Sequence, residues 1–232
     1  MILRNSLNFI NKFLSNFSNY INNIYLNSNY YDKKISKISQ DKLIYKPSPY
    51  LLSSLIKYQK KKINIDDIVT ENLWNNKNKN FEKLNNFYWF FSLDLKSSKK
   101  NTQKIITEWI NKNSRFNFKS WSFDITSKRI IAWLSNHSLT VDGSDKHYLN
   151  IFNGMIQKQT NHLINEIDKS KLIDDKLIGC ASIILVGLCY QNEKNYLLFG
   201  SSLLKKFSKL TLDNFGFPRS RNIKQLVFYL KY

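Results

Sequence analysis

The feature that most constrains the fold is a helical periodicity in the C-terminal two-thirds of the chain. Apolar residues recur every three or four positions in successive stretches between Ser98 and Tyr232, with short polar connections between them. This spacing places apolar side chains on one face of an α-helix. Only 6 glycines and 3 prolines occur in 232 residues, which argues against a turn-rich β fold. The pattern predicts an all-α protein built from antiparallel helical hairpins.

Capping residues and breakers set the expected helix boundaries. Ser98, Asp124 and Ser144 are placed to cap the starts of three helices. Gly216 and Pro218 mark a loop over residues 212–222. The predicted helices span residues 98–111, 145–168, 172–190, 196–210 and 223–232, with a further one starting at Asp124.

Residues 1–80 form a separate predicted region, and residues 81–232 form the helical domain. Leu7, Leu14 and Ile21 belong to an apolar stripe that predicts an amphipathic first helix, which we expect to pack on the body of the protein. Polar residues interrupt the stripe, so it predicts neither a signal peptide nor a transmembrane helix. We expect the rest of this region to be irregular, with a short helix over residues 50–60. The compartment stays open: the cytoplasm is the default, and the periplasm is an alternative.

Charge and cysteine content limit the partners, disulfides and cofactors that can be expected. The net charge of +19 favours an acidic partner, although an AT-rich coding sequence would also enrich lysine. The sequence contains no compact block of Lys and Arg of the kind that predicts specific nucleic-acid binding. Cys180 and Cys189 lie nine positions apart on one predicted helix, so they cannot form a disulfide. No metal-ligand spacing occurs, and we expect neither a metal nor another cofactor.

Polar residues beside the apolar stripe of the 145–168 helix are the first candidate site. Gln159, Asn161 and His162 could lie in a packed seam between helices, or they could line a cleft where chemistry takes place. Arg129 raises the same alternatives. It lies on the apolar face of its helix, four residues before Trp133, and could grip an acidic ligand or be a buried structural arginine.

The order of several landmarks resembles a known family. The aromatic segment 85–95 is followed by Trp121 to Leu134, then by residues 159–163, and finally by the loop 213–222. This series is similar to the N-terminal helical domain of heparinase II/III-like proteins, over about residues 81–232. The resemblance implies that the hairpins form part of an α/α toroid.

The resemblance also implies a chemistry, the β-elimination of uronic-acid-containing polysaccharide. Asn161 and His162 look like the pair that such lyases place at the uronate carboxylate, where donors stabilise developing charge. The resemblance makes Arg219, Arg221 and Asn222 substrate-binding candidates, together with Arg129 and Gln159. No residue matches the family's catalytic tyrosine, and nothing resembles its C-terminal β-sandwich. We therefore expect a fragment that is inactive on its own and whose partner is the missing sandwich domain.

Two other classes of function compete with the lyase hypothesis. The chain could be a non-catalytic helical scaffold or binding module for anionic glycans, acting through its basic faces. It could also bind nucleic acid through net charge alone, with steep salt dependence and no sequence preference.

Overall fold

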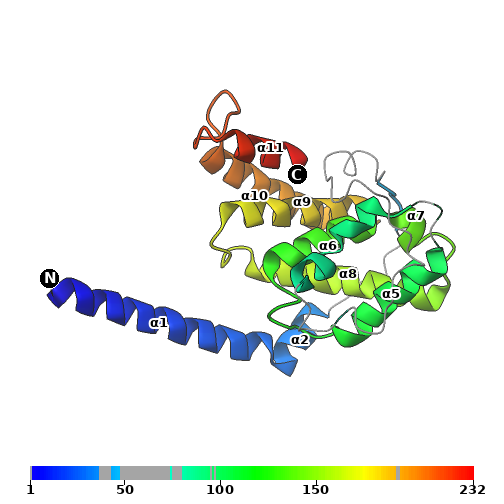
Figure 1. Cartoon of the computed structure of the whole chain (residues 1–232), viewed down its shortest axis with the longest axis horizontal. Coiled ribbons are helices and arrows are strands. Elements are labelled where there is room, and N and C mark those ends of the chain that lie inside the picture. Colours follow the sequence, from blue (N-terminus) through cyan, green and yellow to red (C-terminus); the bar gives the residue numbers. More distant parts are fainter. Residues whose placement is uncertain are drawn as a thin grey trace.

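The computed structural model describes residues 2–36, 43–47, 74, 80–94, 96, 98–191 and 194–232 and shows an all-α protein (Figure 1). Within these residues no strand forms, although Leu43 and Leu212 make isolated bridges to Tyr190 and Pro218. The all-α prediction is confirmed, and the toroid stays a prediction. The elements are α1 (Ile2–Leu26), α2 (Asn29–Ile35), α4 (Phe81–Asn85), the 3-10 helix η2 (Tyr88–Ser92), α5 (Lys99–Lys112), α6 (Phe123–Ser135), α7 (His137–Thr140), α8 (Lys146–Glu166), α9 (Ile173–Cys189), α10 (Lys194–Thr211) and α11 (Ile223–Lys231).

One of the three expected caps is confirmed. The Ser98 hydroxyl accepts a hydrogen bond from the backbone N–H of Asn101 at the start of α5. At the start of α8 the cap is Asp145 rather than the expected Ser144: the Asp145 carboxylate accepts from the N–H of Tyr148, whereas the Ser144 hydroxyl donates to the carbonyl of Val141. Asp124 is not a cap, because α6 begins one residue earlier. It lies in the first turn of α6, where a carboxylate favourably faces the positive end of the helix dipole.

The core is centred on aromatic rings from α5, α6 and the turn before η2. The rings of Trp109 and Trp133 meet edge to face with centroids 5.5 Å apart. Phe87 meets Trp133 in the same way at 5.1 Å. All three side chains are fully buried. Edge-to-face pairs add about 0.5–1.5 kcal/mol each to the gain from burial, so this cluster ties the two helices to the aromatic segment.

Helix α9 packs against α6, α8 and α10. Gly187 lies against the backbone of Leu197, and Gly200 lies against Ile184. A residue later in α9 contacts one earlier in α10, and the reverse holds for the second pair. Helices α9 and α10 therefore form the antiparallel hairpin expected from the sequence. The absence of a side chain at Gly187 lets the two backbones approach closely.

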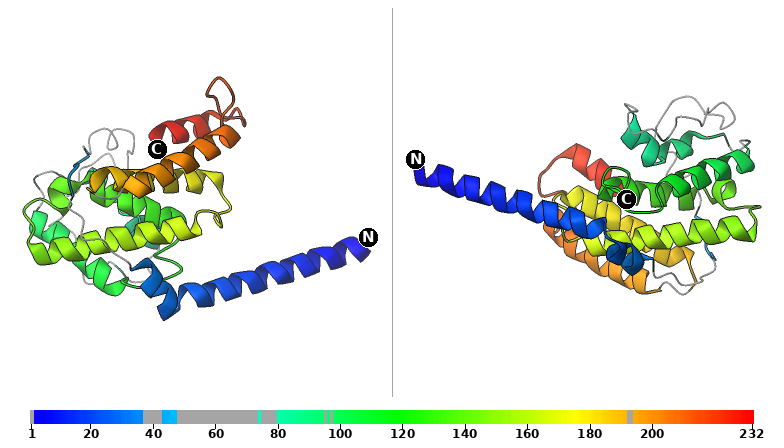
Figure 2. Two further views of the ribbon diagram at one scale, coloured as in Figure 1. Left: turned by 180° about the vertical axis from the view of Figure 1, so that it is seen from behind. Right: turned by 90° about the horizontal axis from the view of Figure 1, so that it is seen from below.

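Helix α1 does not pack along the body, contrary to the expectation from its amphipathic pattern. Figures 1 and 2 show it projecting from the fold, joined at its C-terminal end to α2. Leu26 is buried at this junction. The Ser28 hydroxyl caps α2 after the turn, and Tyr31 and Ile35 of α2 enter the core. Helix α2 therefore occupies the position on the body that we expected α1 to cover.

The N-terminal region shares the core of the helical domain. Tyr31, Ile35 and Trp74 belong to the same buried cluster as the tryptophans of α5 and α6. The short helix expected over residues 50–60 lies outside the described residues. None of the described helices is both long and apolar enough to cross a bilayer.

The close approach at Gly187 gives a prediction for stability. A Cβ atom there would collide with the backbone nitrogen of Leu197, so Gly187→Ala must push the two helices apart. We expect the variant to lower the free energy of unfolding by about 1–3 kcal/mol, the usual cost of overpacking. Urea denaturation followed by circular dichroism measures this.

The exposed residue Ser201 on α10 provides the control, and Ser201→Ala should change stability by less than about 0.5 kcal/mol. Alanine is the better helix former by about 1 kcal/mol, so a stabilised Gly187→Ala variant would contradict the close packing of α9 and α10.

Candidate functional site

Arg129 is the centre of the most extensive buried polar network in the described structure. Its guanidinium is fully buried on the inner face of α6. It donates from Nε to Oε1 of Gln159 (2.9 Å), from Nη1 to the carbonyls of Asn85 (2.8 Å) and Ser120 (2.9 Å), and from Nη2 to Oγ1 of Thr126 (3.2 Å). These bonds join α6 to α4, to α8 and to the loop before α6.

The positive charge of Arg129 is balanced by dipoles and by an aromatic face. Its Cζ atom lies 3.9 Å from the ring centroid of Trp109, which is a cation–π contact. The indole N–H of Trp109 donates to the side chain of Asn85 (2.7 Å). Within the described residues no carboxylate forms an ion pair with this guanidinium. Burial lowers the pKa of Arg129 well below its usual value, but an arginine starts so high that it stays charged.

This enclosure corrects two expected substrate contacts. Arg129 and Gln159 each expose none of their surface, and they bind one another. A guanidinium whose Nε, Nη1 and Nη2 atoms all donate inside the fold cannot reach a sugar carboxylate in this conformation. The structure therefore gives Arg129 the second of its two expected roles, that of a buried structural arginine.

His162 is also held inside the fold. The ring Nδ1 lies 2.7 Å from the hydroxyl of Tyr31, and Nε2 lies 3.1 Å from the carbonyl oxygen of Trp121. A carbonyl only accepts, so Nε2 carries the proton and Nδ1 accepts from Tyr31. Burial, reinforced by the charges of Arg129 and Lys169, lowers the pKa of His162 to about 4, although its bond to Trp121 opposes this. The neutral ring links α8 to α2 and to the loop before α6.

Asn161 joins three helices at the adjacent position. Its side-chain nitrogen donates to the carbonyl of Ile35 at the end of α2 (2.9 Å). Its side-chain oxygen accepts from the hydroxyl of Tyr196 on α10 (2.7 Å). Asn161 and His162 therefore do not point together at one open space, because each is bonded to a different set of neighbours.

A cavity of about 500 Å³ lies beside His162, between α1, the loop before α6 and the end of α8. Aromatic rings from residues 116–123 form much of its wall, and Asn22 of α1 adds an amide. Glu166 and Lys169 also line it, but they form an ion pair at 2.8 Å. The lining could hold a small polar molecule against aromatic faces. It offers little net charge for an acidic sugar.

The remaining expected contacts lie on the exposed loop between α10 and α11. Arg221 pairs with Asp213 at 2.7 Å yet keeps 67% of its side chain exposed. Arg219 is exposed and donates to the carbonyl of Lys209 (3.3 Å). Asn222 caps α11 by accepting from the N–H of Lys224 (2.9 Å). Backbone hydrogen bonds from Phe215 and Phe217, together with the charge of Arg221, lower the pKa of Asp213, so the carboxylate stays ionised as the anchor of the loop.

The expected site residues therefore fall into two groups. Arg129, Gln159 and His162 are buried around α6 and α8, whereas Arg219 and Arg221 are exposed on the loop. None of the loop residues lines the cavity beside His162. Figure 1 shows the loop after α10 and the α1 side of the body at different edges of the molecule. The structure does not bring the two groups together in one cleft.

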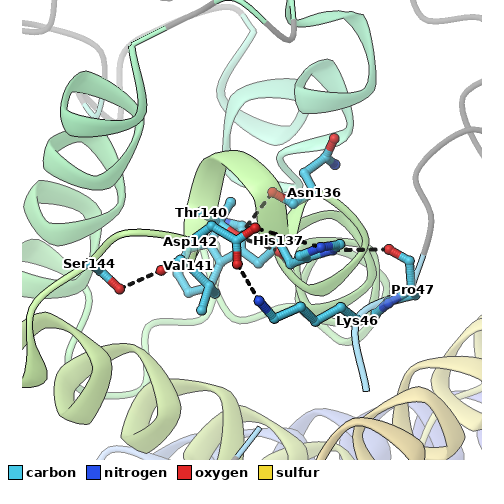
Figure 3. A network of polar contacts seen from close by, with 9 residues as sticks. Lys46, Pro47, Asn136, His137, Thr140, Val141, Asp142 and Ser144 are labelled. Atoms are coloured by element: carbon cyan, nitrogen blue, oxygen red, sulfur yellow. Dashed lines mark hydrogen bonds and ion pairs between the residues drawn. The ribbon is translucent and has the colours of Figure 1, made fainter. Parts of the chain in front are cut away.

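A histidine–carboxylate–lysine cluster escaped the sequence analysis (Figure 3). Lys46 pairs with Asp142 at 2.5 Å, and the Nδ1 of His137 donates to the carbonyl of Pro47 (3.1 Å). Burial alone would raise the pKa of Asp142, but the hydrogen bond and charge of Lys46, with help from His137, lower it. The cluster clamps residues 43–47 onto the end of α7. No local motif could have revealed it, because Lys46 and Asp142 are 96 positions apart.

No metal or reactive-thiol chemistry is apparent in the part of the chain that the structure describes. No group of three or more His, Cys, Asp or Glu side chains there could hold a metal ion. Cys180 and Cys189 are buried free thiols, and burial raises the pKa of each to about 12. At neutral pH they are protonated and therefore poor nucleophiles.

The lowered pKa of His162 predicts a pH dependence of stability. The unfolded chain takes up a proton near pH 6.5, whereas the folded chain resists protonation until about pH 4. Stability is therefore highest above pH 6.5 and falls as the pH drops toward 4, by up to about 3 kcal/mol from this group. The free energy of urea unfolding, measured from pH 7 to pH 4, tests this.

Replacing the ring should remove that component. His162→Gln should flatten the pH dependence, and His147→Gln, at an exposed histidine, should leave it unchanged. Equal slopes for His162→Gln and the wild type would show that His162 is not held neutral.

The network around Arg129 predicts a large cost for a conservative substitution. Arg129→Lys keeps the charge but cannot serve four acceptors spread around a planar fork. We expect a loss of about 3–5 kcal/mol, as for other broken buried charge networks. Arg115→Lys, at an exposed arginine, should cost less than about 0.5 kcal/mol. Similar thermal midpoints for the two variants would rule out this role for Arg129.

Comparison with known proteins finds similarity to one segment of a much longer polypeptide. The chain is 32% identical over 228 residues to Protein Ycf2 of Physcomitrium patens, in an alignment that covers 92% of this chain and 9% of that protein. It therefore spans less than a tenth of the length of this curated relative. No family model and no solved structure matches the chain. The resemblance to heparinase II/III-like proteins stays a prediction that these comparisons do not test.

Proposed function

We propose that this chain is a non-catalytic helical module that binds an acidic polysaccharide through a basic surface. We call this the α10–α11 surface. It consists of exposed basic side chains on α10, on the loop that follows it and on α11: Lys205, Lys206, Lys209, Arg219, Arg221 and Lys224. The observation that carries the proposal is the charge balance of residues 194–232. Asp213 is the one acidic residue in this segment of the sequence.

The geometry of the loop supports binding to carboxylate or sulfate groups. The Asp213 carboxylate accepts from the N–H groups of Phe215 and Phe217 (2.9 Å each), which fixes the turn. Arg219 and Arg221 extend from this turn, and a guanidinium fork matches a carboxylate or sulfate. Phe215 exposes 86% of its surface beside them, and an aromatic face can stack on a sugar ring.

The internal hydrogen bonds of the candidate catalytic residues support a binding role over a lyase role. In a β-elimination, His162 or Asn161 would have to bind or deprotonate a uronate. Both ring nitrogens of His162 are hydrogen-bonded within the fold, and the Asn161 amide bridges α2 and α10. The lyase hypothesis would require these internal hydrogen bonds to break and contacts with the substrate to replace them.

Binding to heparin and to polygalacturonate, measured by calorimetry at physiological salt, tests the proposal. We expect Arg219→Gln with Arg221→Gln to weaken binding about tenfold, since two partly screened ionic contacts are worth roughly 1.4 kcal/mol together. Lys99→Gln with Lys100→Gln is the matched control. It removes the same charge from exposed positions on α5 and should change the affinity less than about twofold.

Three outcomes would overturn the proposal. Equal weakening by both double variants would show that net charge alone drives binding. Duplex DNA that displaces the glycan at equal phosphate concentration would favour nucleic acid. Release of unsaturated sugar, detected by its ultraviolet absorbance and abolished by His162→Ala, would establish the lyase hypothesis instead.

A further inference from the structure

Helix α1 carries an uninterrupted heptad pattern of apolar residues. Leu7, Leu14 and Ile21 occupy one set of positions seven residues apart. Leu3, Ile10, Phe17 and Ile24 occupy the second set, so that the intervals alternate between four and three along the whole helix. These two sets correspond to the a and d positions of a coiled coil. A strict seven-residue repeat is the pattern of a helix that packs along another helix.

The described part of this seam faces solvent. Leu14, Phe17, Ile21 and Ile24 each expose 51–56% of their surface. The residues of α1 that line the cavity against the body are Ser18, Asn19, Asn22 and Leu26. At about 100° per residue, Asn19 and Leu26 lie on the opposite side of the helix from the seam. The described part of the fold therefore leaves the seam uncovered from Leu14 to Ile24, which agrees with the projection of α1 in Figure 2.

The seam also has the shape that receives a partner side chain. Leu14, Phe17, Ser18 and Ile21 line a shallow apolar groove of about 570 Å³ along α1. Four residues with this spacing form the hole into which a coiled-coil partner inserts one side chain. Phe13 stacks on Phe17 with centroids 6.5 Å apart and widens the apolar rim.

The positions that flank the seam indicate which helix fits. In heterotypic coiled coils, charged residues at these e and g positions select the partner. Here the flanking residues carry a single charge, that of Arg4, and α1 contains no acidic residue. Two copies would therefore meet without opposed like charges along the seam. The polar face is rich in Asn and Ser, whereas helices that lie on membranes usually present Lys and Arg there.

We propose that α1 is a self-association helix, and that its heptad seam forms a coiled coil with the same seam of another copy of this chain. The bodies of the two chains, each chain having a net charge of +19, would sit outside the helix pair. Their mutual repulsion is screened by salt, so the association should strengthen as salt rises. This inference is independent of glycan binding, which uses the α10–α11 surface.

Sedimentation velocity of the full chain tests the proposal. We expect a mass of at least twice 27.6 kDa at a concentration of about 100 µM, and tighter association at about 0.5 M salt than at about 0.05 M. Leu14→Lys with Ile21→Lys places two charges in the seam and should raise the dissociation constant at least about 100-fold. Near-ultraviolet circular dichroism should be unchanged, since α1 projects from the core.

The control adds the same charge to the other side of the helix. Asn16→Lys with Asn23→Lys uses exposed positions at the same seven-residue spacing, and it should self-associate like the wild type. A monomeric wild type at both salt concentrations would overturn the proposal. Binding of a monomeric wild type to phosphatidylglycerol vesicles, lost in the seam variant, would assign the helix to a membrane instead. Equal weakening by both variants would show that the seam is not the contact.

Discussion

The burial of one positive charge organises the central part of this protein. The guanidinium of Arg129 is closed off from bulk solvent, so its N–H groups must find acceptors within the fold. Those acceptors come from α4, from α8 and from the loop before α6, and the ring of Trp109 on α5 supplies a cation–π contact. Four separate segments are therefore held at positions that satisfy one side chain. Since a broken buried charge network is costly, we regard this arrangement as the least replaceable part of the fold.

Two of the expected site residues, Gln159 and His162, are enclosed on α8, the helix that Arg129 contacts. Gln159 faces Arg129, and His162 lies on the same helix, bonded to Tyr31 and Trp121. Polar residues beside an apolar stripe serve here as connectors between packed helices. The two proposed functions use surfaces outside the core, namely the basic α10–α11 surface and the exposed part of the α1 seam. A module with one surface for an acidic polymer and a separate helix for self-association could bind such a polymer at several points at once, which raises its avidity.

Predictions from the sequence succeeded where neighbouring residues determine the outcome. The helical stretches after residue 98, the cap at Ser98, and the loop at Gly216 all follow from local periodicity and hydrogen bonding. Asp124 failed as a cap because α6 starts at Phe123 with Ser122 at the cap position, and a difference of one or two residues lies within the usual error for helix ends. The cluster of Lys46, His137 and Asp142 was missed because its members lie far apart in the chain.

The sequence by itself determined the all-α class, the amphipathic first helix and a strongly positive chain, because these depend on composition and on periods of three and four residues. It left open whether Arg129, Asn161 and His162 face a cleft or a seam, since a periodic pattern gives the side of a helix but not what covers that side. Only the tertiary structure decided this. It placed α2 rather than α1 against the body, so that Tyr31 reached His162 and the apolar seam of α1 was left facing solvent.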